Sequence, residues 1–163
     1  MPIYQQQTWA HAEHSIGREI DSVLMSEQEM SKFMNQLRER GSGALDKKMG
    51  IQIIEASPQR LVATMPVEGN TQPLGLLHGG ANVVLAESLG SIGTQLHAGQ
   101  DRRVVGVDVN ATHHKSATKG VVTAIATAIS LGKTMCSYEI VITNEEGQRT
   151  CTARITCLIL AHR

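Results

Sequence analysis

The segment from Gln72 to Leu96 constrains this chain more than any other part of its sequence. At about 100° of rotation per helical residue, four apolar residues spaced four, three and four apart fall on one side of a helix. These residues are Leu85, Leu89, Ile92 and Leu96. Such a stripe predicts a helix of roughly four turns whose apolar side lies on a sheet.

The opposite side of this predicted helix carries one charged residue, Glu87, among small ones. Ser91 and Thr94 lie beside it on the helical wheel, and Gly90 is close by. A helix side that faces water usually carries several Lys, Arg or Glu residues. We therefore expect another surface to approach this side closely and to bury the Glu87 carboxylate.

The helix is preceded by His78, Gly79 and Gly80, which leave backbone N–H groups uncovered at its N-terminus. These groups have no intrahelical acceptors and lie at the positive end of the helix dipole, where they can bind an oxyanion or a polarised carbonyl. Gly79 and Glu87 are eight residues apart in sequence, or about 12 Å along the axis. One chain cannot bring both to one carbonyl, so a site that uses both requires two antiparallel copies of the helix in a dimer.

A carboxylate and a helix N-terminus at one site suit acyl transfer. The carboxylate can act as a general base on water or as a direct nucleophile, and the N–H groups polarise the acyl carbonyl. A thiolate is a good leaving group for such a reaction. From these residues alone, the alternative stays open that Glu87 only hydrogen-bonds Ser91 or a backbone group and thereby specifies a dimer.

The composition narrows the classes of partner. The chain has 163 residues, which is typical of one domain with a sizeable core. Its 15 Lys and Arg residues balance its 15 Asp and Glu residues, so no overall field attracts nucleic acid or an anionic membrane. The few aromatic residues disfavour stacking on bases or sugars; they are Tyr4, Trp9, Phe33 and Tyr138.

The three cysteines, Cys136, Cys151 and Cys157, lack the spacing of a zinc or redox motif and lie in strand-like sequence. They predict reduced, mostly structural thiols. The N-terminus shows no pattern of a secretory signal, and the sequence has no apolar run of about 18 residues. We therefore expect a soluble, cytoplasmic protein.

Residues 1–42 predict a helical extension ahead of a main domain at 43–163. A capping box at Ser26–Glu29 starts a helix, and Gly41 is a typical helix stop. The apolar side of that helix is Met30, Phe33, Met34 and Leu37. His11 and His14 are better interpreted as surface histidines than as a metal pair, and no metal site is predicted. We expect this extension to serve packing or oligomer contacts.

From Ile51 onward the apolar pattern changes to the period of two that is typical of strands. Strands are predicted at 51–55 and 60–65, joined across Ser57 and Pro58, and at 104–110, 121–129, 135–143 and 149–160. In the strand after the helix, Val105, Val107 and Val109 alternate with Gly106 and Asp108, as in a half-buried strand. The order of elements predicts an α+β fold in which an antiparallel sheet curls around the central helix.

Two partial motifs do not fit their context. Residues 132–134, Gly-Lys-Thr, resemble the end of a phosphate-binding loop, but Thr127 stands where that motif needs Gly, and a hairpin is predicted there. Ser88 lies in a near match to the serine-hydrolase pattern, but inside a helix rather than at a strand–helix turn. Neither a nucleotide-binding loop nor a hydrolase serine is expected.

Residues 71–80, Thr-Gln-Pro-Leu-Gly-Leu-Leu-His-Gly-Gly, and 86–91, Ala-Glu-Ser-Leu-Gly-Ser, closely resemble the hotdog-fold acyl-CoA thioesterases. More narrowly, they are similar to the branch that contains the 4-hydroxybenzoyl-CoA thioesterase with a helix Glu and the 1,4-dihydroxy-2-naphthoyl-CoA thioesterases. The resemblance extends over residues 45–160 and includes 105–113, Val-Gly-Val-Asp-Val-Asn-Ala-Thr-His. It implies a hotdog fold with an extra helical segment at the N-terminus.

The resemblance also implies roles for particular residues. Glu87 would be the nucleophile or general base, and the Gly79 N–H would polarise the thioester carbonyl. Gln72 and His78 would hold the carbonyl or the water, and Ser91 would assist one turn after Glu87.

A second set of residues is implied in binding the rest of the substrate. His113 would lie near the site, with Gly80 at the helix N-terminus. Lys115, with Lys133 as a weaker candidate, would lie near the phosphates of coenzyme A, where a point charge suffices.

The function that the resemblance implies is hydrolysis of acyl-CoA thioesters, with an aromatic or otherwise compact acyl group, to free acid and CoA. The implied assembly is a homotetramer, a dimer of dimers, whose sites combine Glu87 of one chain with Gln72, His78 and Gly79 of its neighbour. No cofactor is implied, because the helix end stabilises the oxyanion. Two alternatives are an acyl-CoA hydratase or dehydratase of the same fold and a non-catalytic acyl-CoA-binding dimer module.

Overall fold

The computed structural model describes residues 28, 31–33, 35 and 43–161. From residue 43 on, the elements are α3 (Ala44–Met49), β1 (Gln52–Ala56), β2 (Arg60–Pro66), α4 (Gly79–Ala98), β3 (Arg103–His113), β4 (Val121–Leu131), β5 (Met135–Thr143) and β6 (Arg149–Leu160). Most of the predicted helical extension, His11 and His14 included, lies outside the described residues. Phe33, which is described, is helical and packs against the core.

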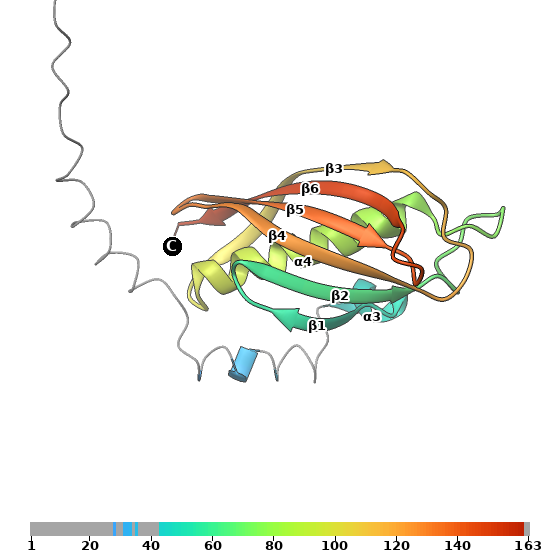
Figure 1. Cartoon of the computed structure of the whole chain (residues 1–163). Coiled ribbons are helices and arrows are strands. Elements are labelled where there is room, and N and C mark those ends of the chain that lie inside the picture. Colours follow the sequence, from blue (N-terminus) through green and yellow to red (C-terminus); the bar gives the residue numbers. More distant parts are fainter. Residues whose placement is uncertain (1–27, 29–30, 34, 36–42, 162–163) are drawn as a thin grey trace, which may run out of the picture.

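The strands form one antiparallel sheet in the order β1-β2-β4-β5-β6-β3. Figure 1 shows this sheet curling around α4, which contacts every strand from β2 to β6. The apolar stripe predicted on the helix is buried in this contact; its members are Leu85, Leu89, Ile92 and Leu96. The predicted antiparallel sheet around a central helix is thereby confirmed.

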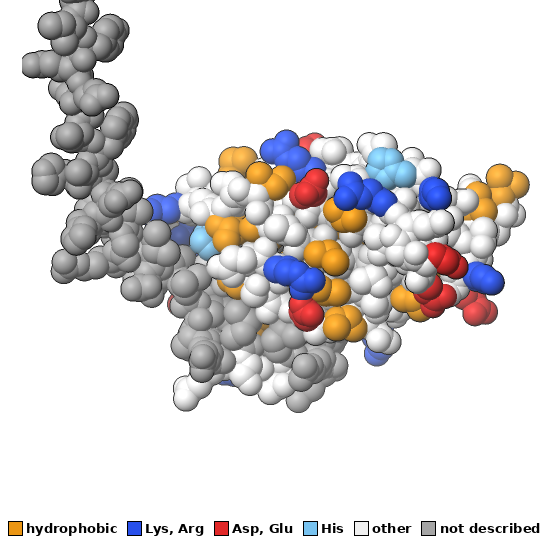
Figure 2. All heavy atoms as spheres, in the orientation of Figure 1, with side chains coloured by type: hydrophobic (Ala, Val, Ile, Leu, Met, Phe, Trp, Pro, Cys, Tyr) orange, Lys and Arg blue, Asp and Glu red, His pale blue; other side chains and the backbone are white. Residues whose placement is uncertain are grey.

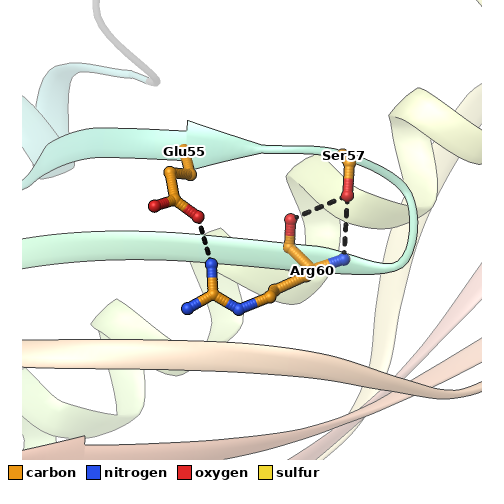
Figure 3. A network of polar contacts seen from close by, with 3 residues as sticks. All are labelled: Glu55, Ser57 and Arg60. Carbon is orange, nitrogen blue, oxygen red and sulfur yellow. Dashed lines mark hydrogen bonds and ion pairs between the residues drawn. The ribbon is translucent and has the colours of Figure 1, made fainter.

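The first hairpin turns at Ser57 and Pro58, as predicted. The Ser57 hydroxyl donates to the Arg60 carbonyl and accepts from the Arg60 N–H, both at 3.0 Å. The Arg60 guanidinium pairs with Glu55 across the two strands (Figure 3). Both charged side chains are largely exposed, so the ion pair contributes roughly 0.2–1 kcal/mol, and the turn depends mainly on the serine.

The side of the sheet that faces α4 combines small and large residues. In β4, Val122, Ala124 and Ala126 are fully buried, whereas the residues that alternate with them are only partly buried or exposed. Tyr138 of β5 is also fully buried, and its hydroxyl donates to the Pro58 carbonyl at 2.7 Å. Burial raises the pKa of Tyr138, so the phenol keeps its proton at neutral pH.

The small-residue side of α4 is filled largely by the chain's own sheet. A Cβ on Gly90 would lie 2.1 Å from Cγ2 of Ile155, and one on Gly93 would lie 2.7 Å from Tyr138. Thr94 is fully buried and donates to the Gly90 carbonyl at 2.8 Å. At these residues, the surface expected to approach this side closely is the chain's own sheet, which covers more than one side of the helix.

Strand β3 departs from regular alternation at a β-bulge. Its pairing with β6 shifts register between Gly106 and Asp108, and such a shift moves the following side chains to the other face of the strand. Val105 and Val107 are 43% and 59% exposed, whereas Val109 packs against the core. The three valines that alternate in the sequence therefore do not share one face.

None of the described helices is long and apolar enough to cross a membrane. On the face of the molecule in Figure 2, basic and acidic side chains are interspersed with hydrophobic ones. This distribution matches the balanced charge of the sequence and gives that face no field of a single sign.

Gly90→Ala tests the close contact between α4 and β6. Alanine is favoured over glycine inside a helix by about 1 kcal/mol, but its methyl group would overlap Ile155. We expect the overlap to dominate and to lower the free energy of unfolding by roughly 1–3 kcal/mol, as measured by urea denaturation. Ile155→Ala should largely remove this penalty in the double variant. A Gly90→Ala protein as stable as its parent would contradict the contact.

Candidate active site

The loop between β2 and α4 holds Gln72 beside the start of the helix. The Gln72 N–H donates to the Leu76 carbonyl at 2.8 Å, and the Gly75 N–H donates to the Gln72 carbonyl at 2.9 Å. Gly75 has a φ of 74°, a left-handed conformation that glycine adopts without strain. This tight turn fixes the backbone of Gln72 close to Gly79.

His78 is the N-cap of α4. Its Nδ1 accepts from the Gly80 N–H at 2.9 Å, which satisfies one of the free donors at the helix start. His78 is exposed, and the cap occupies the Gly80 N–H. Gly79 is the first residue of the helix, so its N–H has no acceptor within the helix and is free to bind another group.

A surface pocket opens at this end of α4. Its lining brings together four of the residues predicted for the site: Gln72, Gly79, His113 and Lys115. Asn82, one helical turn after Gly79, also lines it. These four predicted site residues are thus adjacent in the folded chain, whereas His78 and Gly80 are not part of the lining.

The imidazole of His113 lies directly against Gly79. A Cβ on Gly79 would be 2.8 Å from Nε2 of His113, so a side chain there would displace the ring. On the other side of the ring, Nδ1 of His113 is 3.4 Å from Nδ2 of Asn82. The Asn82 side chain is 5% exposed, and its Oδ1 has no hydrogen-bond partner among the described residues.

The two lysines predicted near the CoA phosphates lie far apart in one chain. Lys115 is exposed at the pocket. Lys133 follows Gly132, whose carbonyl is 3.2 Å from Nε2 of His97 at the other end of α4. His97 is 18 residues after Gly79 in sequence, a rise of about 27 Å. Within one protomer, Lys133 therefore lies far from Lys115 and its pocket.

Glu87 lies in a second hollow on α4, whose lining includes Ser91, Val84 and Ile92. Its carboxylate rests against β3, since a Cβ on Gly106 would be 3.1 Å from Oε1 of Glu87. In the single protomer Glu87 is exposed. The predicted burial is therefore not met within one chain and would need a surface from another.

The thiol beneath this hollow keeps its proton. Sγ of Cys157 is 3.9 Å from Oγ of Ser91. Burial raises the pKa of Cys157, hydrogen bonding to Thr94 and Ser91 partly offsets this, and the nearby charge of Glu87 adds to it. Burial also raises the pKa of the other two cysteines, Cys136 and Cys151. All three are free and buried, as expected of structural thiols, and none is poised as a nucleophile.

A second carboxylate forms part of the wall beside Glu87. Asp46 of α3 is 5% exposed, and its Oδ1 accepts from the Ser88 hydroxyl at 2.7 Å. The hollow is therefore acidic, whereas the pocket at the helix start carries Lys115 and His113. Among the described residues, no group of three or more His, Cys, Asp or Glu side chains is arranged to hold a metal ion.

Asn82, Asp46 and Gly106, which lie in or beside these two hollows, were not predicted from the sequence. Asn82 is the only amide in the first turns of α4, a signal that could have marked it. Asp46 comes from a short helix without a distinctive pattern, and Gly106 matters only because β3 passes beside Glu87. For the last two, the sequence offers no local signal.

Comparison with known proteins identifies the family. The model of the thioesterase superfamily matches residues 74–151. A putative esterase from Deinococcus radiodurans is 38% identical over 153 residues, 93% of this chain and 96% of that protein. The chain belongs to the thioesterase superfamily. The 1,4-dihydroxy-2-naphthoyl-CoA hydrolase of Escherichia coli is 39% identical over 128 residues, 78% of this chain and 94% of that protein.

Solved structures give the same result. A mutant thioesterase from Pseudomonas aeruginosa superposes with a TM-score of 0.73 at 38% identity, covering 77% of this chain and 92% of that chain. The hotdog fold and thioester hydrolysis, both implied by the resemblance, are thereby confirmed. The Deinococcus relative leaves only 7% of this thioesterase unmatched (100% − 93%), so it shares most of residues 1–42 as well.

Gly106→Ala tests whether the position of Glu87 matters for this thioesterase. The added methyl group would press on the carboxylate and shift it by a few tenths of an ångström. We expect kcat for thioester hydrolysis to fall about tenfold, because small misplacements of a reacting group are costly. Glu146→Ala, in the exposed turn before β6, is the control and should retain its rate. Equal rates for Gly106→Ala and the parent protein would show that this contact does not position the carboxylate.

Proposed function

We propose that this thioesterase hydrolyses acyl-CoA thioesters at sites shared by two protomers. Each site would combine Glu87 and Ser91 of one chain with the pocket of Gln72, Gly79 and His113 in its partner. The observation that supports the proposal is the separation of these two groups into different hollows of one chain. Neither hollow alone holds both a carboxylate for attack and an N–H for the carbonyl.

The edge strand β3 offers a surface for the second chain. It ends the sheet, pairing with β6 on one side, and it exposes Val105 and Val107. An open edge with exposed apolar side chains favours pairing with another strand. The strand passes Glu87 at Gly106 and ends at the pocket with His113. Antiparallel pairing of two copies about a two-fold axis would bring each Glu87 toward the partner's pocket.

The charges of the two hollows favour the same arrangement. Glu87 and Asp46 make one hollow acidic, and Lys115 gives the other a positive charge. A two-fold axis would place the acidic hollow of each chain against the basic pocket of its partner. Complementary charge of this kind fixes the register of an interface and speeds its formation.

In the proposed reaction, the Gly79 N–H polarises the thioester carbonyl, and the Glu87 carboxylate promotes attack on its carbon. Glu87 acts either directly, forming a mixed anhydride that water then hydrolyses, or as a general base that removes a proton from water. Coenzyme A leaves as the thiolate and takes up a proton, and the acid is released. In a single turnover in ¹⁸O-labelled water, the general-base route puts label into the released acid. Unlabelled acid would instead show direct attack, with water then adding to the Glu87 carbonyl of the anhydride so that the acid leaves with a Glu87 oxygen.

The two ends of the substrate would occupy different surroundings. The exposed Lys115 would lie near the CoA phosphates, where its charge suffices. The apolar side chains of Leu45, Val84 and Ile92 beside Glu87 would favour a compact or aromatic acyl group. The name of the Escherichia coli relative supports an aromatic one. We also propose a dimer of dimers in the cytoplasm, which the free thiols support.

Glu87→Gln tests the proposed role of the carboxylate. The amide keeps the size of the side chain but cannot act as a base or as an effective nucleophile. We expect kcat for release of CoA from aromatic acyl-CoA substrates to fall at least about a thousandfold, or ~4 kcal/mol of barrier. The assembly, measured by light scattering, should be unchanged.

Glu146→Gln, in the exposed turn before β6, is the matched control and should retain full activity. An active Glu87→Gln protein would remove Glu87 from the chemistry. A parent protein that binds acyl-CoA without hydrolysing it, with a Glu87→Gln variant that dissociates, would favour the non-catalytic module. Addition of water to an unsaturated acyl-CoA without release of CoA would favour the hydratase.

A further inference from the structure

Asn82 has an unusual position for a side chain that neither the sequence analysis nor the family comparison marks. It lies in the first turns of α4, 5% exposed, in the wall of the Gly79 pocket. A buried amide oxygen without a partner costs about 1–3 kcal/mol, and Oδ1 of Asn82 has none among the described residues. An atom of this kind in a pocket wall indicates a place that a ligand completes.

The nitrogen of the Asn82 amide lies beside the imidazole of His113. Its Nδ2 is 3.4 Å from Nδ1 of His113. An amide nitrogen can only donate, so Nδ1 of His113 has to accept, and the proton of the neutral ring is then on Nε2. Hydrogen bonds in empty active sites are often long and shorten when the substrate binds.

The proton on Nε2 lies at the ring atom that is nearest to Gly79. Nε2 is the ring atom that lies against Gly79, 2.8 Å from where its Cβ would be. The free N–H of Gly79 is therefore accompanied by a second donor from the end of β3. Two N–H donors side by side at a helix start are a pair that can stabilise an oxyanion.

We propose that Asn82 sets the tautomer of His113, so that its Nε2–H acts with the Gly79 N–H as a second donor to the thioester carbonyl. Asn82 is thus a positioning residue that acts through His113. The donor role rests on the proposed thioester hydrolysis, whereas the tautomer is a property of the free protein. Loss of one oxyanion donor slows acyl transfer about a hundredfold or more.

The tautomer can be read directly by ¹⁵N NMR of the full-length, histidine-labelled protein, with His113→Ala to assign the signals. In the parent protein we expect the neutral His113 ring to carry its proton on Nε2. Asn82→Asp replaces the donor by an acceptor, so the proton should move to Nδ1 at a pH at which the ring is still neutral. A parent ring protonated on Nδ1, or a tautomer unchanged by Asn82→Asp, would overturn the proposal.

The kinetic consequence is tested on the same proteins. We expect Asn82→Asp to lower kcat about a hundredfold with KM changed only a few-fold. Asn144→Asp, the same change in the β5–β6 turn, should have no effect. In a His113→Ala background, Asn82→Asp should add much less than it does alone, because its effect passes through the ring. An equal loss in both backgrounds would overturn the proposal.

Two further outcomes keep the conclusions separate. Thermal denaturation shows whether each variant is folded. If Asn82→Asp does not fold, Asn82→Ala, which adds no charge, replaces it in the same comparison. The His113 ring of Asn82→Ala should then populate both tautomers, and a ring still protonated only on Nε2 would overturn the proposal. A parent protein without activity on any acyl-CoA would overturn the proposed function and the donor role with it. The nitrogen shifts would still decide the tautomer by themselves.

Discussion

The close approach of α4 to the curled sheet determines where the reactive groups lie. At Gly90, no side chain separates the helix from Ile155 of β6, and a densely packed interior leaves such a contact little freedom. The missing side chain has the same effect at two other glycines. Gly79 leaves room for the His113 ring, and Gly106 leaves room for the Glu87 carboxylate. Three glycines thus hold the helix, an imidazole and a carboxylate against the sheet.

This packing also explains why the reactive groups are divided. A helix rises about 1.5 Å per residue, so one helix held against one sheet keeps its first turn and its middle apart. Gly79 and Glu87 consequently open into different hollows, of opposite charge, on the same chain. The open edge of β3 passes both hollows, from Gly106 to His113. A two-fold pairing along that edge would bring Glu87 of each chain to the Gly79 pocket of its partner.

The features that were predictable from the sequence are those that depend on local pattern. The period of the stripe from Leu85 to Leu96 predicted the helix, the period of two predicted the strands, and motif spacing predicted the family. The bulge in β3 was not predictable, because it arises from pairing with β6 and leaves the valine pattern unchanged. The Asn82–His113 and Ser88–Asp46 contacts join residues more than 30 positions apart. Contacts of that kind depend on the tertiary fold.

The shared site is tested most directly by mixing two inactive proteins. One protein carries Glu87→Gln, and the other carries both Gln72→Ala and His113→Ala. Each protein therefore lacks a different half of the shared active site. In a mixed dimer, one site receives both damaged halves and the other receives both intact ones. Co-expression should therefore restore about a quarter of the parent activity, from one active site in half of the dimers. Activity that stays at the level of the separate variants, with mixed dimers shown by mass spectrometry, would contradict a site built from two chains.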